Sequence, residues 1–504
     1  MATLPELIHS GRLVEAHRPW PRAVIDADHW RLAIDRLIDG QSILLGLWGE
    51  PDSVHMALLD ERPLAIAVLS LDCPSGRYPS VGAAHPPAIR FERAIQDLFG
   101  LEAEGAKDRR PWLDHGRWGM RHPLGRKEVA GEGAPYAFLP AEGESLHQIA
   151  VGPVHAGIIE PGHFRFTAGG ETVVRLEARL GYAHRGVEGS MQGAGLERAA
   201  RLAGRVSGDS TVAYGLAFAC AAEAALGMDV PPRAVWLRAV MAELERVANH
   251  LGDIGAICND ASFALMHTHC AILRERTLRA AAAAFGHRLM RDCVVPGGVA
   301  SDPDANGVAQ IRALADEVAN RLPALIRLYD DTPSLQDRTV GTGILRAPLA
   351  RQYGAGGFVG RGSGRDFDAR RELAYAPYDR LKFTVPVLEE GDVNARVWIR
   401  IREIEQSLGS IGQLLDGLPD GPIRTSAPSE ISGACEGMAL VEGFRGDILV
   451  SLRLGPDGTV ARCHLRDPSW LQWPLLEAAV EGNIVADFPL CNKSFNCSYA
   501  GQDL

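Results

Sequence analysis

The chain has 504 residues, which exceeds the size of one ordinary domain, so we expect at least two folding units with cores of their own. Apolar residues make up 46% and charged residues 23% of the chain, a balance that is typical of globular proteins and unlike that of disordered ones. The formal net charge is −11 at pH 7 and basic residues are scattered among acidic ones, which argues against a nucleic-acid-binding protein.

The N-terminus carries acids and prolines where a secretory signal would have a basic segment followed by an apolar core. No segment of the chain approaches the roughly 18 to 20 uncharged apolar residues that a membrane-spanning helix needs. We therefore expect a cytoplasmic protein whose membrane contacts come from partners. The nine cysteines are odd in number and include no C-x-x-C pair, so reduced thiols are expected.

Residues 1–130 are predicted to form a small α/β domain. Apolar residues at helical spacing over 26–40 predict a helix, and three apolar runs follow it as strand candidates: SILLGLWG, SVHMALLD and PLAIAVLSL. A second helix is predicted over 86–100, because prolines occupy its first turn and Gly100 ends it. Residues 131–147 lie in a stretch rich in Gly, Pro and small polar residues, which indicates a linker.

Residues 148–504 are predicted to form a second, mainly helical domain with peripheral β-hairpins, so the expected fold class is α+β. Two alternating runs around a Gly-Gly pair predict a hairpin over 163–181, and a P-D-G turn predicts another over 437–466. The Ala- and Leu-rich stretch between them, to about residue 330, predicts a helical bundle.

One helix of this predicted bundle carries two stripes. An apolar stripe runs over 240–254 at spacings of four and three, which predicts that this face is buried. Glu243, Arg246, His250 and Asp253 form a second stripe. Charged residues at these spacings favour a solvated face with i,i+3 and i,i+4 pairs.

Two blocks of sequence carry a resemblance to known families. In the first, E-R-x-x-x-D-L-F-G stands at 92–100, and a P-L-R-K ending survives at 123–127 with one inserted Gly. The segment 78–127 around them resembles the signature of the complex I C subunit, which braces the quinone-site subunit.

The second block consists of five segments in order: GPVHAGIIEPGHFRF (152–166), GYAHRGVEG (181–189), ELERVANHLGDIGAICND (243–260), PGGV (296–299) and EGFRGD (442–447). Together they resemble the large subunit of energy-converting, membrane-bound, complex I-like nickel-iron hydrogenases and its relative, the complex I D subunit. Five ordered matches are far more specific than one short motif. The whole chain thus resembles a fused counterpart of the complex I C and D subunits.

The resemblance implies a metal centre, but this chain lacks its ligands. The family reads R-I-C-G-I-C where this chain reads R-V-S-G-D-S, so Ser207 and Ser210 replace the first two cysteines. The family's second pair of cysteine ligands lies in a D-P-C-x-x-C stretch near the C-terminus. When residues 494–504 are aligned on that stretch, with Tyr499 and Asp503 as anchors, Ser498 and Gly501 stand at the other two ligand positions. Because hydroxyls do not replace thiolates on a low-valent metal, we expect no metal or other cofactor on this chain and no nickel-iron hydrogenase activity.

Polar residues of the family's site persist, and the resemblance gives them roles. Glu160 corresponds to the carboxylate that relays protons beside the hydrogenase metals, and Arg445 to the arginine that overhangs them. Asp209 is new and is expected between the two lost ligands. These three residues are the candidate catalytic groups.

In complex I a His and a Tyr engage the quinone headgroup. The Tyr corresponds to Gly208 here, so quinone chemistry as that family performs it lacks its phenol. His155 and His163 are both candidates for the His. The three serines named above are candidates for lining the cavity.

The resemblance implies an oxidoreductase subunit of the hydrogenase-related group that lacks nickel ligands. Its expected partners are a small subunit that carries an iron-sulfur cluster, antiporter-like membrane subunits, and a formate- or NADH-linked dehydrogenase module. Electron transfer from the iron-sulfur subunit would be coupled to ion translocation at the inner face of the cytoplasmic membrane. Two alternatives remain: a quinone-reducing NADH dehydrogenase-type subunit, and a non-catalytic scaffold for the iron-sulfur subunit.

Overall fold

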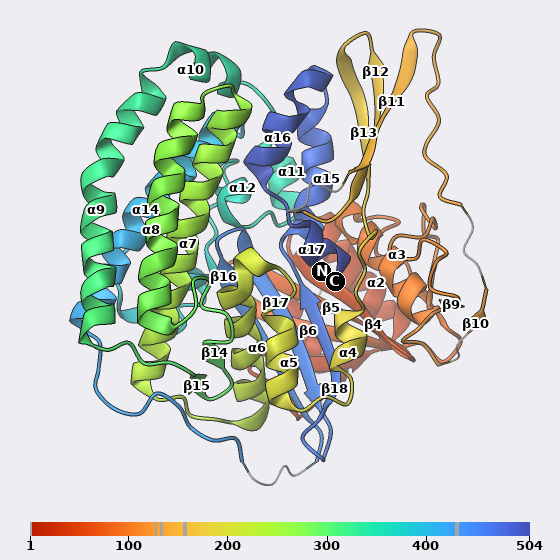
Figure 1. Cartoon of the computed structure of the whole chain (residues 1–504). Coiled ribbons are helices and arrows are strands. Elements are labelled where there is room, and N and C mark those ends of the chain that lie inside the picture. The colour runs from red at the N-terminus through yellow and green to blue at the C-terminus, as the bar shows by residue number, and fades with distance from the viewer. Residues whose placement is uncertain (1–2, 127–128, 132–134, 155–158, 429–432) are drawn as a thin grey trace.

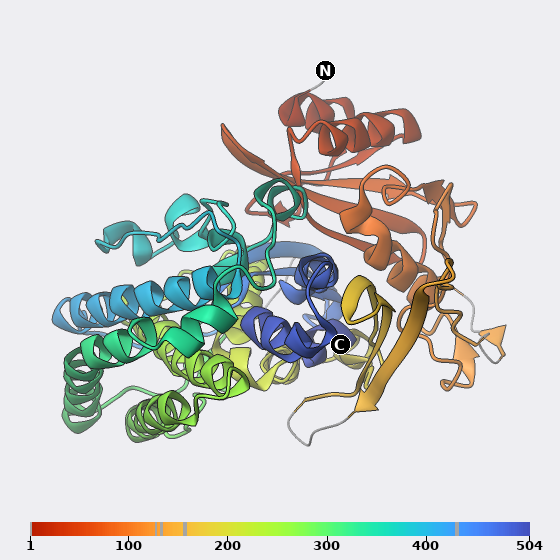
Figure 2. The same cartoon turned by 90° about the horizontal axis from the view of Figure 1, so that it is seen from above.

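The computed structural model describes residues 3–126, 129–131, 135–154, 159–428 and 433–504. An N-terminal α/β unit stands against a long helical bundle, and a β-sheet from the C-terminal part lies between them (Figures 1 and 2). The predicted α+β class, with a small N-terminal unit followed by a mainly helical one, is confirmed.

The N-terminal unit is built on a five-stranded sheet in the order β1-β3-β6-β5-β4. Strands β3 and β6 are parallel and the other neighbours are antiparallel. The two helices and three strands predicted for this region are confirmed. The elements are α1 (Leu4–Ser10), β1 (Arg12–Leu13), β3 (Arg22–Ile25), α2 (Ala27–Ile38), β4 (Ile43–Glu50), β5 (Ser53–Glu61), β6 (Leu64–Asp72), β7 (Arg77–Pro79), η1 (Pro86–Ala88), α3 (Ile89–Phe99), β8 (Glu102–Glu104), β9 (Met120–Arg121) and β10 (Val129–Ala130).

The strands β4, β5 and β6 are mostly apolar because both faces of this sheet are buried. Leu47, Met56 and Leu58 belong to the core that also contains residues of α2 and α3. Trp48 and Leu59 point to the opposite face and pack with residues of the C-terminal sheet. A sheet covered on both sides needs continuous apolar runs instead of an alternating pattern.

The N-terminal segment also contributes a strand to the second unit. Strand β2 (His17–Arg18) pairs in parallel with β16 (Cys435–Gly443), which gives a four-stranded sheet in the order β18-β17-β16-β2. Strands β17 (Gly446–Leu454) and β18 (Val460–Arg466) are the hairpin predicted around the P-D-G turn. The two units therefore share a sheet, and the limits at residues 130 and 148 stay a prediction.

A three-stranded antiparallel sheet projects beside the body of the molecule (Figure 1). It consists of β11 (Leu146–Val154), β12 (Gly162–Gly169) and β13 (Thr172–Arg179), and the predicted hairpin over 163–181 is confirmed as β12 and β13. Gly170 adopts a φ of 61° at the turn, a conformation that favours glycine. On one face, Phe164 and Phe166 pack against Phe488 with ring centroids 4.8 and 5.0 Å away.

The predicted helical bundle is confirmed, and it extends beyond residue 330. Its long helices are α7 (Pro232–Asp260), α8 (Ala264–Phe285), α9 (Ala305–Asp330) and α14 (Val393–Asp416), and α7 packs against both α8 and α14. The other elements are α4 (Val187–Met191), α5 (Leu196–Ala203), η2 (Gly208–Ser210), α6 (Thr211–Leu226), β14 (Val294–Val295), β15 (Gly298–Val299), α10 (Pro333–Thr339), α11 (Ala347–Gln352), α12 (Gly357–Arg361), α13 (Ala369–Glu372), η3 (Tyr378–Arg380), α15 (Ser469–Val480), η4 (Val485–Asp487), α16 (Phe488–Phe495) and α17 (Tyr499–Asp503).

The polar stripe of α7 is buried, so the predicted solvated face is wrong. Glu243, Arg246 and His250 are at most 1% exposed, and Asp253 is 8% exposed. The stripe faces charged partners from other elements instead of water. Examples are Glu243 with Arg370 at 3.0 Å, and Asp253 with Arg400 at 3.0 Å. Spacing alone cannot distinguish a solvated stripe from one that is neutralised by distant segments.

Helix α6 lies directly on β16 and β17, and its Ala-rich surface allows this close approach. A side chain at Gly437 of β16 would collide with the carbonyl of Ala221 in α6, so only glycine fits there. Within the described ranges, no helix combines the length and apolar character needed to cross a bilayer.

Candidate functional site

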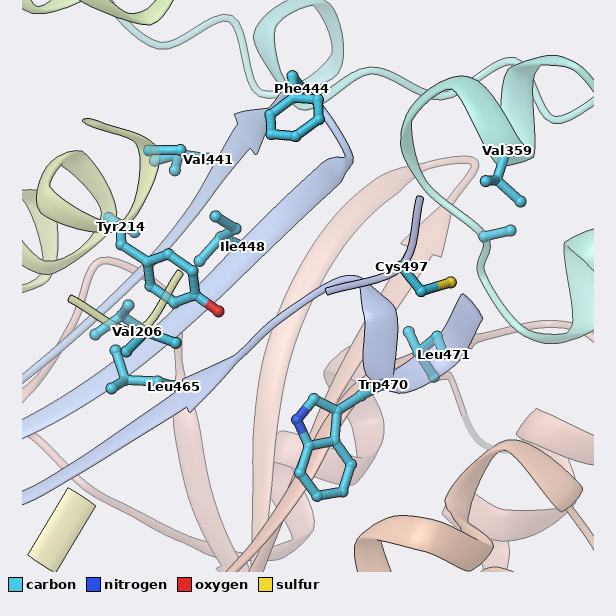
Figure 3. Close-up of a cluster of buried hydrophobic side chains, with 14 of the residues drawn as sticks. Val206, Tyr214, Val359, Val441, Phe444, Ile448, Leu465, Trp470, Leu471 and Cys497 are labelled. Carbon is cyan, nitrogen blue, oxygen red and sulfur yellow. The ribbon is translucent and has the colours of Figure 1, made fainter. Parts of the chain in front are cut away.

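Three loops converge at one end of α6. They are the turn that ends in Ser207–Ser210 before α6, the turn between β16 and β17, and the segment between α16 and α17. In each loop an apolar residue enters the core beside a polar residue of the site: Val206 precedes Ser207, Phe444 precedes Arg445, and Cys497 precedes Ser498. Figure 3 shows Val206, Phe444 and Cys497 among the buried apolar side chains. This alternation anchors the loops and directs the polar neighbours to a common place.

Arg445 and Asp209 form the central ion pair of this site. Arg445 Nη1 donates to Asp209 Oδ1 at 2.9 Å, and its Nη2 donates to the other carboxylate oxygen. The Arg445 guanidinium also lies over the Phe444 ring, 4.5 Å from its centroid. The side chain of Arg445 is 5% exposed and that of Asp209 is 34% exposed, so the pair is open to solvent only on the carboxylate side.

Asp209 is an anion at neutral pH. Burial by itself raises the pKa of this carboxyl group, but the charge and hydrogen bonds of Arg445 and the Ser207 hydroxyl outweigh burial and hold the pKa at about 2. On the other side of the pair, burial lowers the pKa of Arg445, and the Asp209 charge more than reverses this and raises it. The pair is therefore a fixed salt bridge over the ordinary pH range.

The three serines predicted from the lost ligands surround this pair. Ser207 Oγ donates to Asp209 Oδ1 at 2.7 Å and lies 2.9 Å from Ser498 Oγ. Ser210 Oγ accepts from Arg445 Nη1 at 3.2 Å. The structure thus brings Ser207, Asp209, Ser210, Arg445 and Ser498 together, although 291 residues separate the two serines that touch.

The space that a fourth ligand would need is filled by a carboxylate. A Cβ atom at Gly501 would collide with the Asp467 side chain. Tyr214 donates its hydroxyl to Asp467 Oδ2 at 2.7 Å, and the amide N–H of Ser469 donates to Oδ1 at 2.8 Å. The tail is also held by Trp470 Nε1, which donates to the Gly501 carbonyl at 3.2 Å. Asp467 is therefore fixed in the position towards which a side chain at residue 501 would point.

These residues do not fit a nickel-iron centre, which needs soft thiolate ligands. The donors that meet here are three hydroxyls and a carboxylate that is already paired with Arg445. The side chain of Cys497 lies in the core, where burial raises the pKa of its thiol. Cys491 is also buried. Across the residues that the structure describes, no group of three His, Cys, Asp or Glu side chains is arranged to hold a metal ion.

Glu160 lies beside this cluster without joining it. It precedes β12 and is partly exposed. Among the described residues no hydrogen bond connects it to Asp209 or Arg445. Its charge acts instead on Asp503, where burial, opposed by the amide N–H groups of Ala183 and Gly181, raises the pKa to about 7, and Glu160 adds to that increase. Glu160 and Asp503 are thus two neighbouring carboxyl groups at the edge of the site.

The two candidate histidines are not part of the cluster as described. His155 lies outside the described residues. His163 is on β12 but faces away from Phe164 and the tail: its ring is 4.8 Å from that of Phe138, and its Nδ1 lies 2.9 Å from the Gly152 carbonyl. Alternation along a strand explains this, since the neighbouring Phe164 occupies the inward face.

Several groups that hold the site were missed by the sequence reasoning. Glu245 accepts the amide N–H groups of Val212 at 2.7 Å and Ala213 at 3.1 Å at the start of α6. Asn249 donates to the Asp209 carbonyl at 2.7 Å, and the Asn496 carbonyl accepts from Arg445 Nε. Glu245 and Asn249 lie in the segment 243–260, which resembles the hydrogenase large subunit. That resemblance is the sequence feature that could have indicated them. Asp467 and Tyr214 had none, because their partners are distant in sequence.

Two known protein families each match one part of the chain. The description "Respiratory-chain NADH dehydrogenase, 49 Kd subunit" matches residues 260–436, and "Respiratory-chain NADH dehydrogenase, 30 Kd subunit" matches residues 48–134. The two matches lie in the parts of the chain that resemble the complex I D and C subunits, respectively.

Individual relatives cover more of the chain. The carbon monoxide-induced hydrogenase of Rhodospirillum rubrum is 33% identical over 70% of this chain and 98% of its own length. Formate hydrogenlyase subunit 5 of Escherichia coli K12 is 29% identical over 86% of this chain and 78% of its own. The C/D subunit of the NADH-quinone oxidoreductase of Gluconacetobacter diazotrophicus is 31% identical over 82% of this chain and 76% of its own.

A solved structure has the same fold over most of the chain. A chain of the membrane-bound sulfane sulfur reductase, described as an archaeal respiratory membrane complex, matches with a TM-score of 0.68 and 27% identity. The match covers 72% of this chain and 99% of that one. Hydrogenases, NADH dehydrogenases and a sulfur reductase thus share this architecture, so fold alone does not specify the reaction.

Proposed function

This chain belongs to the family that joins the large subunits of complex I-like, membrane-bound hydrogenases with subunits of respiratory NADH dehydrogenases, and from that premise we propose that it works without a nickel-iron centre. In this proposal it is the large subunit of an energy-converting oxidoreductase complex, and electron transfer from an iron-sulfur subunit is coupled to ion translocation. The observation that carries the proposal is the set of side chains at the former ligand positions. Hydroxyls, the Asp209–Arg445 pair and the Asp467 carboxylate occupy that space.

The chemistry that these groups support is proton handling and not metal binding. The Arg445 charge keeps Asp209 ionised, so Asp209 accepts hydrogen bonds and does not exchange a proton near neutral pH. Asp503, with a pKa of about 7, is suited to exchange protons there, and Glu160 is its partly exposed neighbour. We assign proton transfer between solvent and the site to the Glu160–Asp503 pair, and electrostatic stabilisation of the site to Arg445.

Quinone reduction is less well supported by the site. Tyr214 is fully buried and its hydroxyl is committed to Asp467, so it does not replace the phenol that is missing at Gly208. Arg445 already donates hydrogen bonds to the Asp209 carboxylate. An oxygen of a quinone headgroup would therefore have to compete with a carboxylate for this donor.

The proposed partners are an iron-sulfur small subunit, antiporter-like membrane subunits and a formate- or NADH-linked dehydrogenase module, at the inner face of the cytoplasmic membrane. The names of the relatives support this assembly, since they include a formate hydrogenlyase subunit, NADH-quinone oxidoreductase subunits and a chain of a respiratory membrane complex. We propose that the iron-sulfur cluster is held by the small subunit, because the described part of this chain offers no ligand set for it.

The test is elemental and kinetic analysis of the complex purified through a tag on this chain. We expect non-haem iron without stoichiometric nickel, and electron transfer from the donor module that falls at least about tenfold in Arg445→Ala. The conservative variant Arg445→Lys should retain part of the rate. Stoichiometric nickel would overturn the proposal. An unchanged rate in both Arg445→Ala and Glu160→Gln would instead support a scaffold without a redox role.

A further inference from the structure

One stretch of α7 contacts both halves of the Asp209–Arg445 ion pair. Asp209 lies in the loop before α6 and Arg445 in the turn between β16 and β17, 236 residues further along the chain. Four side chains of α7, none more than 9% exposed, reach these two segments. We call them the α7 clamp: Glu245, Arg246, Asn249 and His250.

Glu245 and Asn249 hold the segment that carries Asp209. Asn249 Nδ2 donates to the Asp209 carbonyl at 2.7 Å. The two carboxylate oxygens of Glu245 accept from the amide N–H groups of Val212 at 2.7 Å and Ala213 at 3.1 Å. Glu245 and Asn249 are four residues apart and therefore lie on one face of the helix. Because the backbone is fixed at Asp209 and again at the start of α6, the direction in which the Asp209 side chain leaves it is fixed as well.

Arg246 holds the backbone of the turn that carries Arg445. Gly443 and Gly446 are paired at the end of the β16–β17 ladder, so only the two residues between them form the turn. The Arg246 guanidinium donates to the carbonyls of Gly443 and Glu442, both at 3.1 Å. It therefore fixes the end of the strand directly before the turn.

His250, one helical turn after Arg246, contacts the first residue of that turn. Its ring lies edge-on to the ring of Phe444, with centroids 6.1 Å apart. The other neighbour of the Phe444 ring is the Arg445 guanidinium, 4.5 Å from the ring centroid. His250 is itself held by Glu403, whose carboxylate lies 2.7 Å from Nε2. The helical bundle thus supports the Arg445 side chain as well as the backbone before it.

The C-terminal tail also reaches both segments, but it contacts different atoms. The Asn496 carbonyl accepts from Arg445 Nε, and Ser498 Oγ lies 2.9 Å from Ser207 Oγ. These contacts end on side chains of the site, whereas the hydrogen bonds of the α7 clamp end on backbone atoms. A helix of 29 residues that packs against both α8 and α14 is also a more rigid support than the short segment between α16 and α17.

We propose that the α7 clamp positions the Asp209–Arg445 pair for electron transfer, and that Asn249 and Arg246 are its positioning residues. The inference rests on the proposed function, in which Arg445 stabilises the site electrostatically. Fixed charges act most strongly when they are held in place before the reaction, and a displacement of about 1 Å can lower a rate about a hundredfold. Because both segments are bonded to one helix, α7 sets the relative position of the two charges.

The experiment is a double-mutant cycle on the complex purified through a tag on this chain, with the rate of electron transfer from the donor module as the readout. Asn249→Ala removes an amide that donates to a loop carbonyl and, at 2.9 Å, to the carbonyl of Glu245. The control is Gln413→Ala on α14. Its amide likewise donates to a loop carbonyl, that of Lys382 at 2.8 Å, and to the carbonyl of Gly409, four residues before it, at 3.3 Å. None of the site residues named above lies in the loop that contains Lys382.

We expect Asn249→Ala to lower the rate at least about tenfold and Gln413→Ala to lower it less than about twofold. In an Arg445→Ala background, Asn249→Ala should lower the rate less than about twofold, because the charge that it positions is absent. Equal factors in both backgrounds would assign Asn249 to general stability and overturn the proposal, as would a wild-type rate in Asn249→Ala. A wild-type rate in Arg445→Ala would instead overturn the electrostatic role that the proposed function gives to Arg445.

Arg246→Lys tests the other segment of the site in the same way. Lysine keeps the positive charge near Glu243 and Glu403 but lacks the fork of a guanidinium that reaches two carbonyls. We expect the rate to fall at least about fivefold, and this loss to disappear in the Arg445→Ala background. A loss that persists unchanged in that background would overturn the proposal. This second cycle decides the question if Asn249→Ala does not assemble, and urea unfolding shows whether each variant is folded.

Discussion

Two groups of buried charges lie along the same long helical bundle, and they differ in how completely protein surrounds them. The site pair, Asp209 and Arg445, is one ion pair with a carboxylate that is 34% exposed. The second group, which we call the bundle network, has no member more than 3% exposed. It consists of Glu243, Arg246, His250, Arg361, Asp368, Arg370, Glu403 and Glu442.

Other protein groups provide most of the hydrogen bonds that the charged side chains of the bundle network need. Arg361 donates to Glu403, Glu442 and the carbonyl of Phe367, at 2.6 to 2.9 Å. Glu243 accepts from Arg370, from the Tyr378 hydroxyl at 2.6 Å and from the Ser407 hydroxyl at 2.6 Å. Burial, together with the charge of Asp368, raises the pKa of Glu442 to about 7, which reduces the excess of acids.

The degree of enclosure determines how strongly each group of buried charges contributes to stability. A network enclosed on all sides fixes the relative positions of α7, α12, α13, α14 and β16, and changing one member leaves the others uncompensated. A pair at the edge has a carboxylate that water can also solvate, so we expect substitution of that carboxylate to cost less stability. Four measurements test this contrast, in decreasing order of expected effect.

Arg361→Met should have the largest effect. It removes the guanidinium that connects Glu403 with Glu442 and leaves buried acids without their partner, which costs about 3–5 kcal/mol of unfolding free energy. Urea unfolding followed by circular dichroism measures the loss. Arg312→Met is the control: this arginine is 43% exposed, and loss of its pair with Asp416 should cost about 0.5 kcal/mol. Equal losses in the two variants would contradict the structural role of the network.

Gly501→Ala should come next. The new Cβ would meet the Asp467 carboxylate, which Tyr214 and Ser469 hold in place, so we expect a loss of about 1–3 kcal/mol. Gly409→Ala on α14 is the matched control, because nothing lies within 4 Å of its Cβ position. It should stabilise the protein by about 0.5–1 kcal/mol. A Gly501→Ala protein as stable as wild type would show that the former ligand space is open.

Asp209→Asn should cost less than Arg361→Met, about 1 kcal/mol. Asparagine keeps an oxygen that accepts from Arg445, and the side chain already contacts solvent on one side. The loss is measured by the same urea titration. A cost equal to that of Arg361→Met would place the site pair in the same structural class as the network.

The smallest effect concerns a third buried polar cluster, where the two units meet. Trp48 lies between His55 and His464, with ring centroids 5.5 and 5.1 Å away. Burial lowers the pKa of both histidines, and the nearby guanidinium groups of Arg22 and Arg462 lower them further, while Glu188 opposes this for His464.

Because folding lowers the pKa of both histidines, the unfolded chain binds more protons than the folded protein as the pH falls through the unfolded His pKa of about 6.5. Stability is therefore full above that pH and falls as the pH drops from about 6.5 towards 5, by at most about 1.4 kcal/mol per pH unit for each histidine. Unfolding titrations at several pH values measure this slope, and His55→Asn should reduce it. A slope unchanged in that variant would show that His55 is not the group responsible.

Local elements of the fold and part of the candidate site could be predicted from the sequence. Helices α2 and α3, strands β4 to β6 and both hairpins followed from periodicity, turn residues and capping glycines, because these signals act between residues close in the chain. The resemblance of the R-V-S-G-D-S segment and of the tail to the family's ligand motifs pointed to Ser207, Asp209, Ser210 and Ser498, and the structure brings these four residues together.

The way in which these parts contact one another depends on residues that are far apart in the chain. Tertiary structure determined that β2 leaves the N-terminal unit to join the C-terminal sheet, that Asp467 fills the space next to Gly501, and that the polar stripe of α7 is neutralised by residues more than a hundred positions away. A charged side chain has the same spacing in sequence whether its partner is water or a distant arginine. Only the packing of remote segments determines the solvation of that charge, and with it whether the residue holds the fold together or remains available for chemistry.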